Sequence, residues 1–424
     1  MTHPDLSSSS VHPTPRAADI TLGAARFLDV AAGTWRTADI RLTGGRIVEI
    51  TEPAPAGAAP AGERVDLTGR FVLPGLIDCH VHVLAVDADL SQLMDTPTSY
   101  VMFGAARLMS DMLDRGFTTV RDMAGADFGI HRAQREGLLR APKIFFAGRA
   151  LSQTGGHGDA RGPGRTTDVE HRCCPSLSRI ADGVDAVRLA ARDELRTGAH
   201  HLKIMVSGGV ASPTDRIDST QYSLDEIRAV VEEAEAANRY VAAHAYTPRA
   251  IQRALACGVR TIEHGNLIDE ETVALVKRHN AFVTMNLVTY RALADEGAGL
   301  GLPAESVAKV GAVLDGGISA LRLLHAAGLN PAYGSDLLGA MQRHQAGEFA
   351  IRAEHQPTLE VIRAATTVAA TVLQREGELG QIIPGAAADL VVLDEDPLQD
   401  ISVLAESRLR AVVQDGVVVA GRLG

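Results

Sequence analysis

Residue types that bind metals stand at or near the ends of short apolar runs at several points along the chain. The positions are His80, His82, Lys203, His244, His264 and Asp336. Each run has the length and composition of a β-strand. In a parallel (β/α)8 barrel all strand ends meet on one face, where enzymes of that fold do their chemistry. Residues scattered in the sequence are therefore predicted to form one cluster in space.

Strand-like runs alternate with helical patterns between about Pro74 and Glu376. The runs are Leu76–His82, Phe117–Asp122, Lys143–Gly148, His201–Val206, Tyr240–His244, Arg260–His264, Ala281–Asn286 and Asn330–Asp336. This alternation predicts an α/β fold with a parallel sheet, and eight strands are the number that close a barrel. An open doubly wound sheet would fit the alternation too. It would not bring the ends of the first, fourth, fifth, sixth and eighth strands together, so we favour the barrel.

Local signals mark several element ends. Ser223, followed three residues later by Glu226, predicts a capping box at a helix start. Gly198 follows an amphipathic pattern as a helix-ending glycine. Gly44 and Gly45 lie between two strand-like runs and predict a hairpin turn.

Both ends of the chain have β patterns. Residues 17–73 alternate short strands and turns, and strand-like runs return over 377–424. We therefore expect one small composite β-sandwich domain built from both chain termini, beside a barrel formed by 74–376. Residues 1–16 are rich in Ser, Pro and Thr and lack the apolar segment of a secretion signal, so a disordered tail is expected.

Composition excludes several kinds of partner. The chain carries 52 acidic and 41 basic residues, a net charge of -11, whereas a nucleic-acid-binding surface is basic. We therefore expect no nucleic-acid partner. We also expect no membrane span, because the sequence has no run of 18 consecutive apolar residues. The four cysteines form no CxxC pair, which favours a reducing, cytoplasmic location.

The histidines have a plain alternative to metal binding. His80 and His82 would share one face of a strand, because side chains alternate; one could instead pack and the other face solvent. A lone histidine at a strand end, such as His244 or His264, is more often a core residue than a ligand. Two on consecutive strands favour ligands, since imidazole is the commonest metal ligand. Asp336 could bind one metal and also accept a proton from bound water.

Lys203 lies inside an apolar run, where an ammonium is costly unless it is paired or neutralised. Three interpretations are open. It could be a surface lysine at a strand end, or a catalytic lysine with a lowered pKa. It could also react with CO₂ to give a carbamate, an anionic ligand able to bridge two metals. Its place among four histidines and an aspartate favours the carbamate.

The set resembles the amidohydrolase superfamily, in the subtype whose binuclear centre is bridged by a carboxylated lysine. The family pattern matches His80, His82, Lys203, His244, His264 and Asp336, and the flanking motifs PGLIDCHVH and PGAAADLVVLDEDPL are similar too. The resemblance implies two divalent metal ions, expected to be Zn²⁺, and an N6-carboxylated Lys203. It also implies a homo-oligomer.

Two further motifs, Ala150–Asp159 and Val206–Asp215, resemble the branch with bacterial prolidases, Xaa-Arg dipeptidases and ochratoxin-hydrolysing amidases. The resemblance implies a small-molecule amide or dipeptide substrate, such as an Xaa-Pro dipeptide or ochratoxin A. A metal-bridging hydroxide would cleave the amide to a C-terminal amino acid, with Asp336 moving the proton to the leaving nitrogen.

The resemblance also suggests substrate contacts. His157 would hydrogen-bond the scissile carbonyl, although "GGHG" could be a flexible glycine loop with an incidental histidine. Tyr246, Tyr290 and Arg216 are candidates for the substrate carboxylate, and the tyrosines could equally serve packing.

Two other functions stay open. A cyclic-amide hydrolase of the imidazolonepropionase type would keep the fold and change the reaction. A scaffold that has lost its metals would usually have lost its ligands too, and this chain retains them. Lys203 argues against a deaminase, because deaminases of this superfamily usually lack the lysine ligand.

Overall fold

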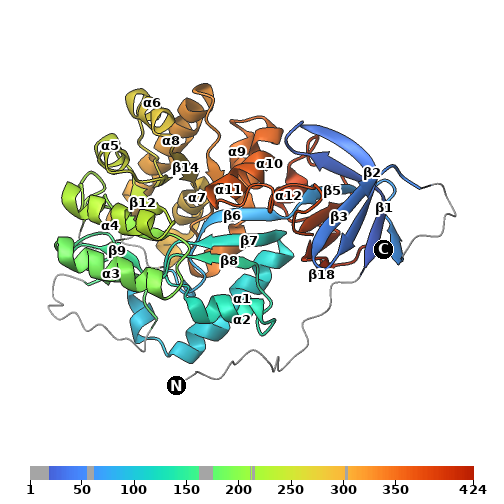
Figure 1. Ribbon diagram of the computed structural model, residues 1–424. Helices are drawn as coiled ribbons and strands as arrows, with labels where there is room; N and C mark the ends of the chain where they lie inside the picture. The colour runs from blue at the N-terminus through green and yellow to red at the C-terminus, as the bar shows by residue number, and fades with distance from the viewer. Residues whose placement is uncertain (1–18, 55–61, 162–174, 211, 213–214, 301–303) are drawn as a thin grey trace, which may run out of the picture.

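The structure is a computed structural model that describes residues 19–54, 62–161, 175–210, 212, 215–300 and 304–424. The tail predicted at 1–16 lies outside the described residues. A sheet of strands from the two chain ends lies beside a larger α/β region (Figure 1).

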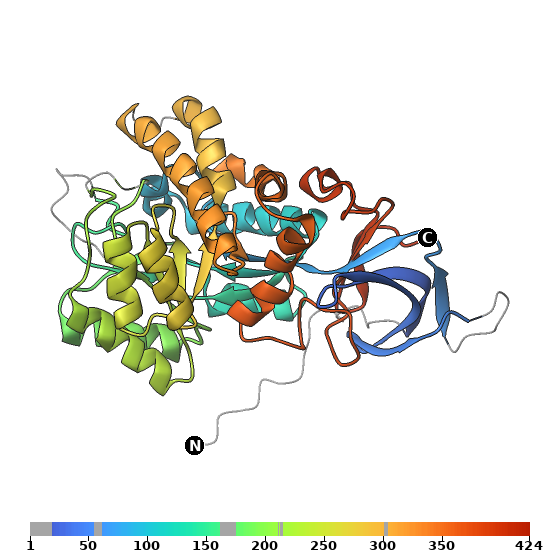
Figure 2. The ribbon, with the colours of Figure 1, turned by 90° about the horizontal axis from the view of Figure 1, so that it is seen from above.

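The first of these parts is an antiparallel-rich sheet with the order β18-β17-β16-β5-β1-β2-β3, in which β4 also pairs with β1. Its strands are β1 (Ile20–Asp29), β2 (Thr34–Thr43), β3 (Arg46–Thr51), β4 (Glu63–Asp66), β5 (Phe71–Pro74), β16 (Leu390–Leu393), β17 (Ala411–Gln414) and β18 (Val417–Gly421). Pairing of β5 with β16 joins the two ends of the chain, which Figure 2 shows as blue and red segments side by side. All eight strands belong to this one sheet, so the predicted sandwich has no separate second sheet among the described residues.

The hairpin predicted at Gly44-Gly45 is confirmed. Strands β2 and β3 pair antiparallel, and Thr43 stands opposite Arg46 across the turn. Both glycines have positive φ, +58° and +79°, a conformation that two-residue hairpins require and glycine adopts freely.

Strands occur at all eight predicted positions in the α/β region. They are β6 (Leu76–Val81), β7 (Phe117–Asp122), β8 (Lys143–Phe146), β11 (Leu202–Met205), β12 (Val241–Ala245), β13 (Thr261–His264), β14 (Phe282–Met285) and β15 (Ala332–Tyr333). Two short strands that we did not predict, β9 (Ala150–Ser152) and β10 (Ser178–Ile180), add to one edge. Every pairing between these strands is parallel, which confirms the α/β class.

Strand pairing gives two parallel sheets among the described residues rather than one closed ring. One has the order β6-β7-β8 and the other β10-β9-β11-β12-β13-β14-β15. Backbone hydrogen bonds link the sheets at both seams. Asp336 N donates to His80 O at 2.8 Å, and His200 N donates to Phe146 O at 2.9 Å.

Helices follow most of the strands. They are α1 (Thr98–Asp114), α2 (Phe128–Arg135), α3 (Val184–Arg196), α4 (Leu224–Ala236), α5 (Pro248–Ala256), α6 (Glu270–Arg278), α7 (Leu287–Glu296), α8 (Ala304–Ala326), α9 (Gly347–Ala353), α10 (Thr358–Ala364), α11 (Thr367–Val372) and α12 (Ser402–Ala405). The Ser223–Glu226 capping box at the start of α4 is confirmed. Gly198, with φ +100°, follows α3 as predicted.

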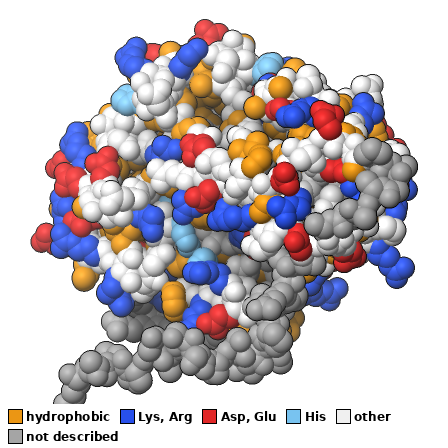
Figure 3. All heavy atoms as spheres, turned by 45° about the vertical axis from the view of Figure 1, so that its right-hand side comes forward, with side chains coloured by type: hydrophobic (Ala, Val, Ile, Leu, Met, Phe, Trp, Pro, Cys, Tyr) orange, Lys and Arg blue, Asp and Glu red, His pale blue; other side chains and the backbone are white. Residues whose placement is uncertain are grey.

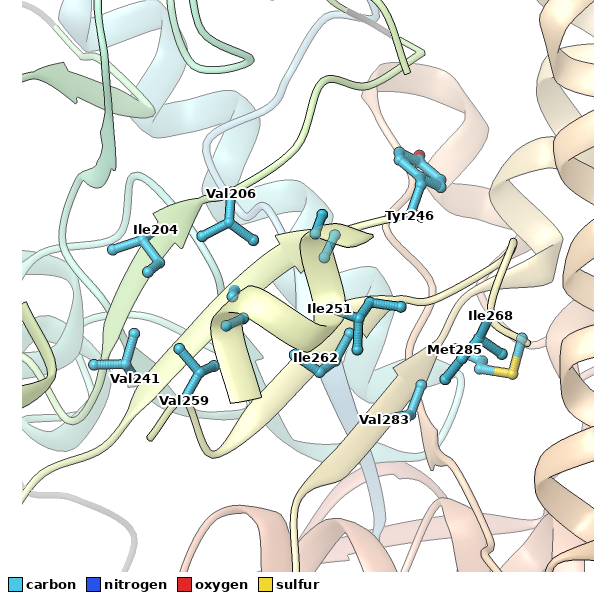
Figure 4. Close-up of a cluster of buried hydrophobic side chains, with 14 of the residues drawn as sticks. Ile204, Val206, Val241, Tyr246, Ile251, Val259, Ile262, Ile268, Val283 and Met285 are labelled. Carbon is cyan, nitrogen blue, oxygen red and sulfur yellow. The ribbon is translucent and has the colours of Figure 1, made fainter. Parts of the chain in front are cut away.

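Alternation along the strands decides which side chains reach the site. Ile204, Ile262 and Val283 belong to a buried cluster that also holds Ile251 of α5 (Figure 4). Their sequence neighbours, among them Lys203, therefore point to the opposite face. Because the apolar side chains pack against the helices, the polar side chains that alternate with them lie on the opposite face of the sheet.

Within the described parts of the chain, no helix combines the length and apolar character needed to cross a bilayer. On the face in Figure 3, basic and acidic side chains are interspersed.

Candidate metal centre

His80, His82 and Asp336 converge at the carboxyl ends of β6 and β15. Nε2 of His80 lies 3.3 Å, and Nε2 of His82 lies 3.1 Å, from Oδ1 of Asp336. One donor atom from each residue lies within 4.8 Å of the others, so the three could hold one metal ion. Imidazole nitrogens with a carboxylate oxygen are a donor set that suits zinc.

The other ring nitrogens of these histidines are held from behind. Nδ1 of His80 lies 2.9 Å from Oε2 of Glu263, and Nδ1 of His82 lies 3.4 Å from the carbonyl oxygen of Ala124. Both partners can only accept, so they favour a proton on Nδ1 and a lone pair on Nε2. Metal-binding histidines are commonly oriented in this way.

A second pair of ring nitrogens faces each other beside this group. Nδ1 of His244 and Nε2 of His264 are 2.7 Å apart. Nε2 of His244 lies 3.2 Å from the Gly208 carbonyl, and Nδ1 of His264 lies 3.1 Å from Oδ1 of Asn286. With their protons on the outer nitrogens, both rings direct lone pairs at the same point. A cation there would stabilise them, so the residues present fit a second metal.

Lys203 is buried in β11, with only 2% of its surface exposed. Burial lowers the pKa of its ammonium to about 8, although Glu263 and Asp336 act in the opposite direction. A lowered pKa gives more of the neutral amine, the form that reacts with CO₂. The environment therefore fits both the carbamate and the catalytic-lysine interpretations, and it excludes a surface lysine.

Asp336 and His264 adopt strained backbone conformations. Their φ angles are +50° and +75°, in the left-handed region that few non-glycine residues occupy. Such strain persists where the surrounding structure enforces it, commonly at functional sites. For Asp336, the backbone hydrogen bond to His80 contributes to that enforcement.

Burial and charge set the protonation of the cluster. Burial opposes ionisation of Asp336, yet His80, His82 and His264 hold the pKa of its carboxyl well below the usual range. Burial lowers the pKa of His264 to about 3 and that of His244 well below its ordinary value. Two neutral imidazoles and a carboxylate are the forms that bind metals.

His157 reaches the cluster from the loop after β9. Its ring stacks on that of His244, with centroids 4.1 Å apart, and Nδ1 lies 3.0 Å from Oγ of Ser212. A side chain at Gly209 would collide with this ring. The Ser212 hydroxyl donates to Asp215, so its oxygen accepts from Nδ1, and the neutral ring then carries its lone pair on Nε2. Donation to a substrate carbonyl requires that proton to shift to Nε2.

The three candidates for the substrate carboxylate lie in different surroundings. Tyr246 and Tyr290 are buried, and their hydroxyls are 2.6 Å apart. The Tyr290 hydroxyl also lies 3.3 Å from Nδ1 of His264, so this pair borders the histidine cluster. The Arg216 side chain is 82% exposed and pairs with Asp218 at 2.7 Å.

Four buried charged residues around the site escaped prediction: Asp78, Arg121, Asp122 and Glu263. Asp78 accepts from the backbone of His80 and Ser335, and Asp122 accepts from that of Val83 and Ala126. These bonds fix the backbone beside the ligands. The sequence signal for these residues was a charged side chain within an apolar, strand-like run. That signal alone does not tell whether the side chain has a buried partner or simply marks the end of a strand.

Comparisons with known proteins identify relatives of this chain. The model of the amidohydrolase family matches residues 71–423. Ochratoxinase from Aspergillus niger is 34% identical over 351 residues, which cover 80% of this chain and 73% of that protein. The structure of a prolidase complexed with N-methylphosphonate-L-proline is 49% identical, with a TM-score of 0.92 over 95% of this chain and 100% of the other. A Xaa-Pro dipeptidase with bound methionine is 26% identical, with a TM-score of 0.85 over 95% and 99%.

The fold and the clustered histidines thus define a hydrolytic enzyme of the α/β class. The chain belongs to the amidohydrolase family. Amide-hydrolysing relatives and the His80–His82–Asp336 group are consistent with hydrolysis of an amide bond assisted by a divalent metal.

Proposed function

We propose that this enzyme hydrolyses the amide bond between an acyl or aminoacyl group and a C-terminal amino acid at a binuclear metal centre. The observation that carries the proposal is the convergence of His80, His82 and Asp336, beside His244 and His264 with their facing ring nitrogens. The similarity to a prolidase, a Xaa-Pro dipeptidase and ochratoxinase points to the substrate class.

The two parallel sheets are proposed to be the two parts of one (β/α)8 barrel formed by 74–376. The hydrogen bonds across both seams, from Asp336 to His80 and from His200 to Phe146, support this. Residues 17–73 and 377–424 would form the composite β domain, consistent with the pairing of β5 and β16.

His80, His82 and Asp336 would hold one metal, and His244 and His264 the other, with a carboxylated Lys203 between them. When bound, two divalent ions, proposed to be Zn²⁺, would activate a water molecule for attack and polarise the amide carbonyl. The burial of Lys203 and the lowered pKa of its amine favour carboxylation.

The chain's own residues have distinct tasks. Asp336 is ionised, so it can accept the proton of the attacking water and transfer it to the leaving nitrogen. His157, stacked on His244, would stabilise the developing oxyanion through Nε2 once that atom carries the proton. Tyr246 and Tyr290 would contact the carboxylate of the substrate through their hydroxyls. Arg216 would have to move to contribute, since it pairs with Asp218 at the surface.

The ligand of the prolidase structure informs the substrate. A phosphonate linked to the nitrogen of proline is tetrahedral and anionic, like the species formed when water adds to an amide carbonyl, and its proline retains a free carboxylate. We therefore favour Xaa-Pro dipeptides and N-acyl amino acids, and ochratoxin A is a further candidate through ochratoxinase. A cytoplasmic location and a homo-oligomer remain predictions.

Amino-acid release from a substrate panel tests the proposal. The zinc-loaded protein would be given Xaa-Pro and other dipeptides, N-acyl amino acids and ochratoxin A, each beside its C-terminally amidated form. Release only from substrates with a free carboxylate is expected. Turnover of a cyclic amide without any release from the panel would favour the imidazolonepropionase type of reaction instead. A folded protein without affinity for zinc would favour a scaffold.

A further inference from the structure

Glu263 lies between a candidate metal ligand and a guanidinium, with no exposed surface. Its Oε2 is 2.9 Å from Nδ1 of His80. Its two carboxylate oxygens lie 2.9 and 3.0 Å from Nη2 of Arg121, and the Thr261 hydroxyl donates to Oε1 at 2.8 Å. These polar contacts of the carboxylate are therefore all made with buried residues of the strands.

Arg121 holds the carboxylate in place through contacts to both parallel sheets. Its Nε donates to the carbonyl oxygen of Cys79 in β6 at 2.6 Å. Nη1 donates to Thr261 of β13 at 3.2 Å, and Nη2 donates to Thr284 of β14 at 2.9 Å. Because a guanidinium is planar and its donors have fixed directions, these bonds leave little freedom in where the carboxylate can lie.

The position of Glu263 has a consequence for His80. The Glu263 carboxylate forms an ion pair with the Arg121 guanidinium at 2.9 Å and accepts from the Thr261 hydroxyl, and its Oε2 faces Nδ1 of His80. An anionic carboxylate only accepts hydrogen bonds, so it keeps a proton on Nδ1 of His80. The lone pair is then on Nε2, the atom 3.3 Å from Asp336.

We propose that Glu263, held by Arg121, is a positioning residue that sets the tautomer and orientation of His80 and strengthens its hold on the metal. The proposal rests on the proposed function in one respect, that His80 binds a metal. Hydrogen-bond partners of metal-binding histidines typically change metal affinity by about 10–100-fold when they are lost.

The chain offers a matched control. Glu348 and Arg352 form a second ion pair, 2.7 Å apart, in which neither side chain is exposed. Arg352 donates to the carbonyl oxygen of Pro331, and Glu348 accepts from the backbone of Val288. Among the described residues, neither member of this pair makes a hydrogen bond or an ion pair with a candidate metal ligand. Glu348→Gln therefore makes the same replacement of a carboxyl group by an amide in a pair of similar burial.

The test compares metal-free wild type, Glu263→Gln and Glu348→Gln. Zinc dissociation constants would be measured by competition with a chromogenic chelator, and urea unfolding would establish that each protein is folded. Glu263→Gln is expected to bind zinc about 10–100-fold more weakly, and Glu348→Gln to bind it as wild type does. The visible absorption spectrum of the cobalt-loaded protein is expected to change in Glu263→Gln alone.

Wild-type zinc affinity and an unchanged cobalt spectrum in Glu263→Gln would overturn the proposal, and so would equal weakening in Glu348→Gln. If Glu263→Gln does not fold, Arg121→Lys takes its place: it keeps the positive charge, loses the fork of donors and is expected to weaken zinc binding too. Wild type that binds zinc but releases no amino acid overturns the proposed function alone. Wild type that does not bind zinc overturns both.

Discussion

Nζ of Lys143 lies 2.6 Å from Oδ1 and 2.5 Å from Oδ2 of Asp389. Lys143 begins β8 of the α/β region, whereas Asp389 directly precedes β16 of the terminal sheet. Asp415 lies 2.8 Å from the same ammonium. Burial lowers the pKa of Lys143, but the two carboxylates raise it above its ordinary value, so the residue stays charged. This ion pair ties the two parts of the chain together.

Lys143→Met is expected to destabilise the protein, because it leaves the Asp389 carboxylate buried without its cation. Breaking a buried pair costs about 3–5 kcal/mol, and we expect roughly 2–4 here, because 22% of the Lys143 side chain is exposed. The free energy of unfolding in urea measures the effect. Lys277→Met, at an exposed lysine, is the control, and equal losses in the two variants would contradict the assigned role of the pair.

Asp336→Asn is expected to abolish turnover without loss of the fold. Asparagine tolerates the left-handed backbone found at this position, φ +50°, so little added strain is expected. The amide cannot accept the proton of the attacking water, and removal of such a base costs about 10²–10⁴-fold in rate. The measurements are kcat/KM, metal content and unfolding free energy. A metal-loaded variant with near-normal activity would show that another group takes the proton.

His157→Ala is expected to lower kcat by about 10²–10³-fold, the effect of losing one oxyanion donor. Zinc content should be unchanged, because His157 stacks on the ring of His244 and is not one of the proposed metal ligands. A variant with a raised KM and an unchanged kcat would assign this residue to substrate binding instead. Ser212→Ala is the informative companion, since it removes the partner of Nδ1 and leaves the imidazole in place.

Strand alternation predicts the face that Lys203 and His244 occupy, whereas the groups behind the candidate metal ligands could not be predicted. Lys203 and His244 each follow or precede apolar residues that pack against the helices, so alternation assigns them to the opposite face. His264 does not follow from alternation: it comes two residues after the helix-facing Ile262, and its left-handed φ of +75° interrupts the extended backbone. Glu263, next to Ile262, lies on the same face as Lys203 and His244, but its partner Arg121 is 142 residues away in the sequence. No local pattern encodes a contact of that kind.

The loops were less predictable than the strands, for a related reason. Arg216 was a candidate for the substrate carboxylate because of its place after β11, yet a nearby acid, Asp218, binds it at the surface. Strands β9 and β10 have only three residues each, too few for a periodic pattern, and their pairing depends on neighbours distant in sequence. By contrast, the Ser223–Glu226 capping box depends on four consecutive residues, and the structure confirms it.

His200 should make stability depend on pH. The backbone N–H of Phe146 donates to its Nδ1 at 3.3 Å, and its ring packs against Phe145, Phe146 and His131. Burial, with help from neighbouring cations, lowers its pKa from 6.5 to about 4. The unfolded chain therefore binds a proton at a higher pH than the folded one. The stability from the neutral ring is fully present above pH 6.5 and is lost as pH falls toward 4.

We expect this group to contribute at most on the order of 3 kcal/mol over that window, from about 1.4 kcal/mol for each pKa unit. His200→Asn keeps an acceptor for the Phe146 N–H but does not titrate. Urea unfolding at several pH values from 4 to 7 gives the difference between wild type and variant, in which contributions of the other titrating groups cancel. That difference should shift in favour of the variant as pH falls. The exposed His279, changed to Asn, serves as the control, and a difference independent of pH for His200→Asn would show that its ring does not titrate in this range.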